Sequence, residues 1–87
     1  LNPKADKNKV SKNEAQDHTA DGFVIFGHGN RLAGNNAHNN LENGIEVAGD
    51  NNTMSKNVAL DNDVFDLADE GGGNRWHKNI YDTASWD

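Results

Sequence analysis

The stretch from residue 30 to residue 47, NRLAGNNAHNNLENGIEV, decides the fold, because its pattern returns along the chain at a fixed interval. Asn30 has counterparts every 22 residues, and Asn35 has counterparts at the same spacing. Self-similarity at a period of roughly 20–50 residues is the signature of repeat architectures. Two columns of asparagine are filled without exception: Asn8, Asn30, Asn52 and Asn74, then Asn13, Asn35, Asn57 and Asn79.

Apolar residues follow the same 22-residue period. Short segments alternate apolar and polar residues, as half-buried strands do, and no segment has the apolar spacing of an amphipathic helix. The L-x-x-L-x-L pattern of a leucine-rich repeat is also missing. The apolar columns are Val10, Leu32, Met54 and Trp76; Ala15, Ala37, Ala59 and Tyr81; Leu1, Phe23, Ile45 and Leu67; and Ile25 with Val47, a column that Asp69 breaks.

Residues one period apart would therefore lie over one another, which requires short strands that pair in parallel from coil to coil. The sequence predicts an all-β fold, a parallel β-helix of about four coils of 22 residues, in a single domain over residues 1–87. Because Leu1 is in phase with Phe23, we expect a segment of a longer protein. The predicted coils span 8–29, 30–51 and 52–73, with a partial closing coil at 74–87 and residues 1–7 ending a preceding coil.

The abundance of asparagine, 15 residues in all, has a physical reason in such a fold. When identical amides stack at strand spacing, each NH₂ group donates to the carbonyl oxygen of the next and satisfies buried polar groups. Asparagine also tolerates the left-handed backbone that tight corners demand. We therefore expect each Asn column to form a ladder along the stack of coils.

The repeat resembles the right-handed parallel β-helix repeats of pectate-lyase-like proteins, alginate epimerases and the periplasmic copper-maturation protein of nitrous oxide reductase. The resemblance implies a right-handed helix, but little about activity, because many functions share these structural positions. Residues 73–85 resemble the closing coil of secreted β-helix proteins, which implies an extracellular or periplasmic location. The residues that carry the resemblance are the N-x-[VLMW]-x-[KG]-N segments, Asn13-Glu14-Ala15, Asn35-Asn36-Ala37 and Asn43-Gly44-Ile45-Glu46-Val47.

Composition narrows the classes of partner. The net charge of −6 argues against general nucleic-acid binding, for which a basic domain is expected. The longest apolar run, residues 23–26, is far too short to enter a membrane. Without cysteine, the chain forms neither a disulfide nor a Cys-based zinc site.

Basic residues also share phase, and they predict a charged face. Lys9, Arg31 and Arg75 fall in one column with Thr53 between them, and a second column holds three lysines. Stacking like charges at strand spacing is unfavourable unless a ligand offsets it, and an acidic polysaccharide would do so through its carboxylates. The alternative is a solvated face that protects the strands from aggregation. The predicted basic face consists of Lys9, Lys12, Arg31, Lys56, Arg75 and Lys78.

A cluster of acidic residues runs from Asp61 to Glu70. Its oxygens could bind Ca²⁺, as acidic loops on lyases of this fold do, with Asp66, Asp69 and Glu70 as the candidate ligands. The cluster lacks the spacing of an EF-hand, so a polar loop leaving the helix is the competing interpretation. No other cofactor is expected, because the four histidines form no metal-binding motif.

Three functions fit these patterns. The favoured one is a structural or carbohydrate-binding segment of a larger extracellular protein, whose basic face meets an acidic polysaccharide. The second is the C-terminal part of a polysaccharide lyase or epimerase, for which Arg31, with Lys9 and Lys56 beside it, offers the only catalytic candidates. The third is a scaffold or assembly module that meets the rest of its parent chain, or another copy, at the open N-terminal coil.

Overall fold

The computed structural model describes residues 6–17 and 19–86, and every regular element in this part of the chain is a β-strand. Each strand is only two or three residues long, because corners interrupt the chain every few residues. The strands are β1 (Lys9–Ser11), β2 (Glu14–Gln16), β3 (Phe23–Ile25), β4 (Arg31–Ala33), β5 (Asn36–His38), β6 (Ile45–Val47), β7 (Thr53–Ser55), β8 (Val58–Leu60), β9 (Leu67–Asp69), β10 (Arg75–His77) and β11 (Ile80–Tyr81).

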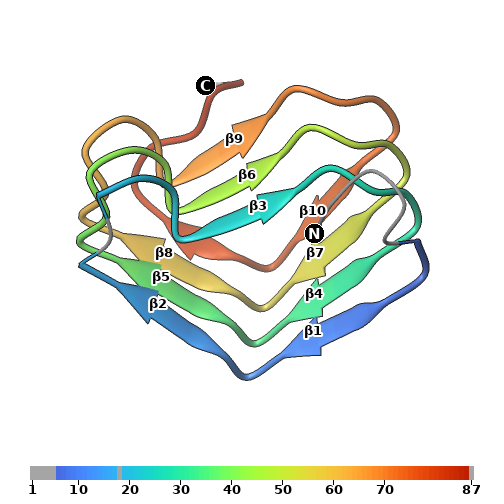
Figure 1. Ribbon diagram of the computed structural model, residues 1–87, viewed down its shortest axis with the longest axis horizontal. Coiled ribbons are helices and arrows are strands. Elements are labelled where there is room, and N and C mark those ends of the chain that lie inside the picture. Colours follow the sequence, from blue (N-terminus) through green and yellow to red (C-terminus); the bar gives the residue numbers. More distant parts are fainter. Residues whose placement is uncertain (1–5, 18, 87) are drawn as a thin grey trace.

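Three parallel sheets form the sides of a solenoid of about three turns (Figure 1). Sheet 1 contains β1, β4, β7 and β10, sheet 2 contains β2, β5, β8 and β11, and sheet 3 contains β3, β6 and β9. Every strand pairs with the strand one repeat away, so Val10 lies against Leu32 and Leu32 against Met54. The parallel β-helix predicted from the repeat is therefore confirmed.

The core is a set of inward columns that run through the stack. The middle residues of the sheet 1 strands point inward, and Leu32 and Met54 are completely buried there. Sheet 2 contributes the small side chains of Ala37 and Ala59, and sheet 3 contributes Ile45. Each coil adds only a few apolar side chains, so polar groups at the corners must also be satisfied for the coil to be stable.

Several corners combine a left-handed residue with an asparagine that follows it, and in the middle coils this asparagine is buried. At the corner between sheets 1 and 2, Gly34 has a φ of 70° and Asn35 follows it. Backbone N–H and Nδ2 of Asn35 both donate to Oδ1 of Asn57, at 2.9 and 3.0 Å, and Nδ2 also donates to the carbonyl of Val10. The predicted amide ladder is confirmed, and it also binds backbone groups that the sequence pattern did not reveal.

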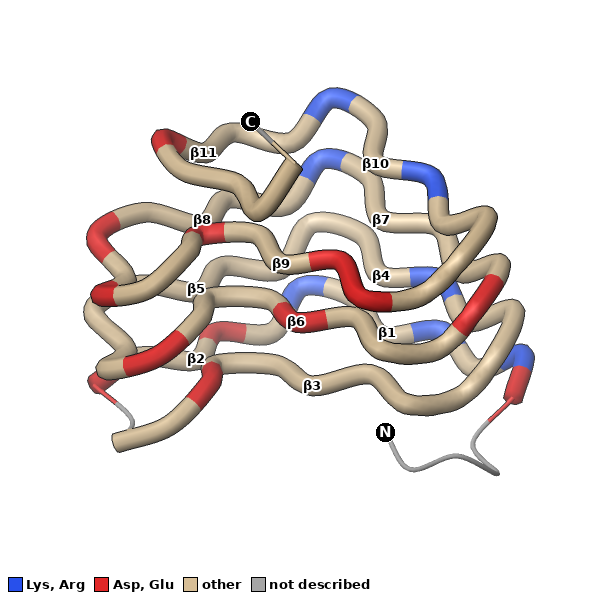
Figure 2. Tube along the Cα trace, turned by 90° about the horizontal axis from the view of Figure 1, so that it is seen from above, with Lys and Arg blue, Asp and Glu red and all other residues tan. Residues whose placement is uncertain are grey.

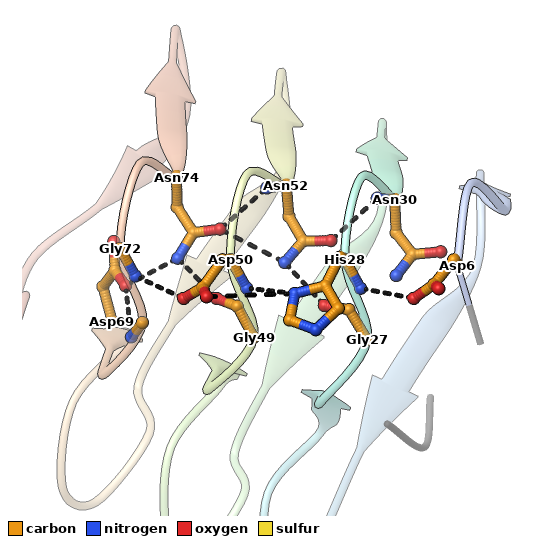
Figure 3. A network of polar contacts seen from close by, with 11 residues as sticks. Asp6, Gly27, His28, Asn30, Gly49, Asp50, Asn52, Asp69, Gly72 and Asn74 are labelled. Carbon is orange, nitrogen blue, oxygen red and sulfur yellow. Dashed lines mark hydrogen bonds and ion pairs between the residues drawn. The ribbon is translucent and has the colours of Figure 1, made fainter. Parts of the chain in front are cut away.

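The other long ladder runs through Asn30, Asn52 and Asn74, where the chain enters sheet 1 (Figure 3). A separate ladder lies outside this asparagine ladder, and it is formed by the residues two positions before each asparagine. The N–H of His28 donates to Oδ1 of Asp6, and the N–H of Asp50 donates to Nδ1 of His28. His28 therefore serves as a hydrogen-bond acceptor between stacked coils.

The last coil closes early. Ala84 pairs with Leu67 of β9, so the chain returns to sheet 3 in fewer residues than a full repeat. Trp86 then packs on Trp76 and Tyr81, with ring centroids 5.1 and 6.1 Å apart. These aromatic rings cover the end of the core.

Candidate anion-binding face

The outward side of sheet 1 carries the first basic column. In each strand of sheet 1 the middle side chain points inward, so the first and third point outward. The register aligns Lys9 with Arg31, Arg31 with Thr53 and Thr53 with Arg75. The three basic side chains are exposed, and the structure confirms that they form one column.

The second basic column lies at the corner between sheets 1 and 2. Lys12, Lys56 and Lys78 all have a φ of 56°, and Gly34 occupies the equivalent position with a φ of 70°. A left-handed backbone costs roughly 1–2 kcal/mol for a residue with a Cβ, and lysine lacks the short polar side chain that helps asparagine there. The sequence placed these lysines in phase, but it gave no sign of their backbone conformation.

Between the two columns lies a strip of small side chains, and two solvent-open hollows lie over it. The lysine hollow, about 390 Å³, is lined by Lys9, Lys12 and Lys56 around Ser11 and Ala33. The arginine hollow, about 600 Å³, is lined by Arg31, Thr53, Ser55, Arg75, Trp76 and His77. Lys78 lines neither of them and borders an adjoining pocket at the end of the solenoid.

The charges of the basic face are available to a ligand. No carboxylate among the described residues lies within 4.0 Å of its six cationic groups, and none lines either hollow. Most Lys and Arg positions gather along sheet 1 and the corner after it, whereas most Asp and Glu lie on the loops and near β6 and β9 (Figure 2). Glu14 on β2 is an exception. An anion in either hollow would meet positive potential without a carboxylate in the lining.

Coil by coil, the two columns complement each other. Thr53 interrupts the first column, but Lys56 of the same coil supplies a cation in the second column. Gly34 interrupts the second column, but Arg31 of the same coil supplies a cation in the first. Each coil that crosses sheet 1 therefore presents at least one cation, and stacked coils lie about 4.8 Å apart. This arrangement suits an extended ligand whose charges repeat along its length.

The catalytic candidates are divided between the hollows. Lys9 and Lys56 border the lysine hollow, and Arg31 borders the arginine hollow. Because no acidic side chain lines either hollow, neither holds a carboxylate that could act with them as a general acid or base. His77 lines the arginine hollow together with Arg31.

The candidate calcium ligands have structural partners instead of a common site. Buried Asp66 accepts hydrogen bonds from the N–H groups of Asn62, Asp82 and Thr83. Asp69, which breaks an inward apolar column, accepts from Nε1 of Trp76, from Nδ2 of Asn74 and from the N–H of Gly71. Within the described ranges no group of three His, Asp or Glu side chains is arranged to hold a metal ion, and the calcium site stays a prediction.

A different acidic group surrounds Glu46 on the outer side of β6, and of its members only Glu70 was among the predicted calcium ligands. The pKa of Glu46 is raised to about 8. The largest cause is a side-chain hydrogen bond with Glu70, followed by one with Asp21, by partial desolvation and by repulsion from these two carboxylates. The sequence pattern missed it because these three residues are diagonal neighbours on adjacent coils and share no column.

Replacing Glu46 with glutamine is expected to reduce the pH dependence of stability. The Glu46 carboxyl holds its proton in the folded chain up to a pKa of about 8, whereas in the unfolded chain it ionises near 4.5. Stability therefore falls as pH rises through this window, because the unfolded chain releases its proton first. Thermal melts at about pH 5 and pH 8 should show a smaller loss of Tm in Glu46→Gln than in the parent chain.

The exposed Glu42 provides a control for this experiment, since Glu42→Gln makes the same change in charge at a side chain that is not a hydrogen-bond partner of Glu46. Its Tm should fall between the two pH values as much as the Tm of the parent chain does. Equal slopes in all three proteins would show that Glu46 ionises normally.

Comparison with family models, with curated proteins and with solved structures finds no match to this chain. In the described part of the chain, no helix has the length and apolar character needed to cross a membrane.

Proposed function

We propose that this chain binds an acidic polysaccharide along its basic face, as a segment of a larger extracellular or periplasmic protein. We further propose that the solenoid is right-handed, like the pectate-lyase-like proteins that its repeat resembles. The single observation that carries the binding proposal is the pair of cation columns, which crosses all four strands of sheet 1 beside open hollows and without bound carboxylates.

The arrangement of cations supports a polymer over a small anion. Lys9 and Arg75 lie on the first and last strands of sheet 1, so the charges extend over the full width of the sheet. A single small anion would reach the cations of one hollow only. A linear chain of uronic acids carries one carboxylate on each ring, and it would pair with cations on successive coils.

The strained lysines support a role in binding as well. Glycine at the position of Lys56 would relieve the left-handed backbone, as Gly34 does one coil earlier. Unfavourable backbone conformations persist where the surrounding structure over-determines them, and they cluster at functional sites. At Lys12 and Lys56 this backbone coincides with the lysine hollow, whereas Lys7 has the same backbone outside both hollows.

Exchanging the two lysines of the lysine hollow for glycine should therefore separate folding from binding. Lys12→Gly/Lys56→Gly is expected to unfold at the same or a slightly higher temperature, because the relief of two left-handed lysines offsets the added freedom of the unfolded chain. Affinity for polygalacturonate should fall about fivefold to tenfold, since each exposed charge contributes up to about 1 kcal/mol. Affinity gel electrophoresis with polygalacturonate, and with neutral dextran as a blank, measures this change.

Lys7 supplies a matched control, because it too is a lysine with a left-handed backbone, φ 57°, but it lines neither hollow. Lys7→Gly should change stability as the lysine-hollow exchanges do, and it should bind polygalacturonate like the parent chain. If the parent chain migrates identically in polygalacturonate and dextran gels at low salt, the proposed function is wrong.

A further inference from the structure

A third hollow, the end pocket, lies where the solenoid closes. It has a volume of about 590 Å³, and three aromatic residues line it: Trp76 on β10, Tyr81 on β11 and Trp86 in the closing segment. Lys78 and Asp69 also line it and supply charged groups. Apolar faces with a few convergent polar groups are the usual lining of a site for a small organic ring.

Two contacts hold the aromatic rings in place. Nε1 of Trp76 donates to Oδ2 of Asp69 at 2.8 Å, which fixes the orientation of the indole ring. Trp86 packs on Trp76 with the ring planes tilted by 41°, and its side chain remains 45% exposed. The pocket therefore offers an aromatic surface that is ordered before any ligand arrives, which lowers the entropic cost of binding.

The end pocket continues the basic face. Trp76 borders both the end pocket and the arginine hollow, and Lys78, the last cation of the second column, borders the end pocket. A polysaccharide chain bound over Arg75 would therefore reach the aromatic rings of the end pocket. Because the end pocket adjoins the arginine hollow, a ligand of the basic face can extend into the end pocket.

We infer that the end pocket binds one sugar ring of the acidic polysaccharide, an inference that rests on the proposed function. One face of a pyranose ring is formed by C–H groups and packs on an aromatic ring, while the hydroxyl and carboxylate groups at its edge remain polar. Trp86 and Tyr81 supply the aromatic faces, and Lys78 pairs with the carboxylate. The pocket distinguishes a sugar polymer from other polyanions, which have charge without a ring of this kind.

Tryptophan fluorescence can report on this pocket directly, because both tryptophans of the chain line it. In Trp76→Phe the remaining indole is Trp86, which borders the end pocket and not the arginine hollow. Titration with short oligogalacturonates should shift or quench its emission, with the same midpoint as binding measured by calorimetry. Polyphosphate of equal charge should leave the emission unchanged.

Trp86→Ala should weaken oligogalacturonate binding by about fivefold to tenfold, and Trp86→Tyr should restore most of the affinity, because tyrosine retains an aromatic face. Leu41→Ala is the matched control, since it removes an exposed apolar side chain that does not line the pocket. Binding that Trp86→Ala does not weaken, with no change in emission, would overturn this inference and leave the proposed function standing. Absence of binding by the parent chain would overturn both.

Discussion

Asn57→Ala is expected to lower the free energy of unfolding by about 3–5 kcal/mol, because several buried partners would lose their hydrogen bonds at about 1–3 kcal/mol each. Oδ1 of Asn57 accepts from the N–H of Asn35 at 2.9 Å and from its Nδ2 at 3.0 Å. Nδ2 of Asn57 donates to the carbonyl of Leu32 and to Oδ1 of Asn79, both at 3.0 Å. Asn57 is completely buried, so water cannot replace these bonds without opening the coil.

Chemical denaturation followed by circular dichroism measures this loss. Asn36→Ala is the control, because Asn36 is the same residue type on β5, where Ala37 and not Asn36 points into the core. The control should change the free energy of unfolding by less than about 0.5 kcal/mol, as most surface substitutions do. Equal stability of the two variants would show that the Asn ladder does not hold the coils together.

Gly49→Ala is expected to be at least as damaging, through steric overlap and not through lost hydrogen bonds. A Cβ on Gly49 would lie 1.9 Å from the carbonyl oxygen of Gly27 and 2.5 Å from that of Phe26, both in the preceding coil. Because these atoms belong to the backbone, relief requires the coils to separate, and overpacking of this kind costs about 3 kcal/mol or more. The variant should accumulate as unfolded or aggregated protein.

Gly72→Ala tests whether the close approach, and not the loss of glycine as such, causes the damage. A Cβ on Gly72 would meet only Oδ1 of Asp50 at 3.7 Å, an ordinary contact. Gly72→Ala should therefore retain the Tm of the parent chain to within a few degrees. A Gly49→Ala variant that melts like Gly72→Ala would mean that the coils are not stacked at this spacing.

The sequence was sufficient for the columns of the solenoid, because residues one repeat apart are direct neighbours across parallel strands. Leu32 on Met54 and Asn35 on Asn57 follow from the 22-residue spacing alone. The basic columns follow in the same way, since Lys9 and Arg31 are also related by one repeat.

Features that depend on the shape of the corners could not be read from the spacing. The Glu46 cluster joins diagonal neighbours, and Gly34 is the one member of the Lys56 column whose residue type indicates the left-handed backbone there. The column of Gly27, Gly49 and Gly71 is visible in the sequence, but its reason, a carbonyl oxygen where the next Cβ would lie, requires the stacked coils. The end pocket exists because Ala84 returns to Leu67 early, which breaks the period.

Backbone amide chemical shifts, followed by NMR during titration with oligogalacturonate, test the proposed binding face most directly. We predict that perturbations concentrate in sheet 1 and the corner after it, residues 9–12, 31–34, 53–56 and 75–78, and in the end pocket, and that they leave β3 and β6 of sheet 3 unchanged. Perturbations centred on the acidic surface around Glu46 would contradict it, and so would a spectrum that does not change at saturating ligand.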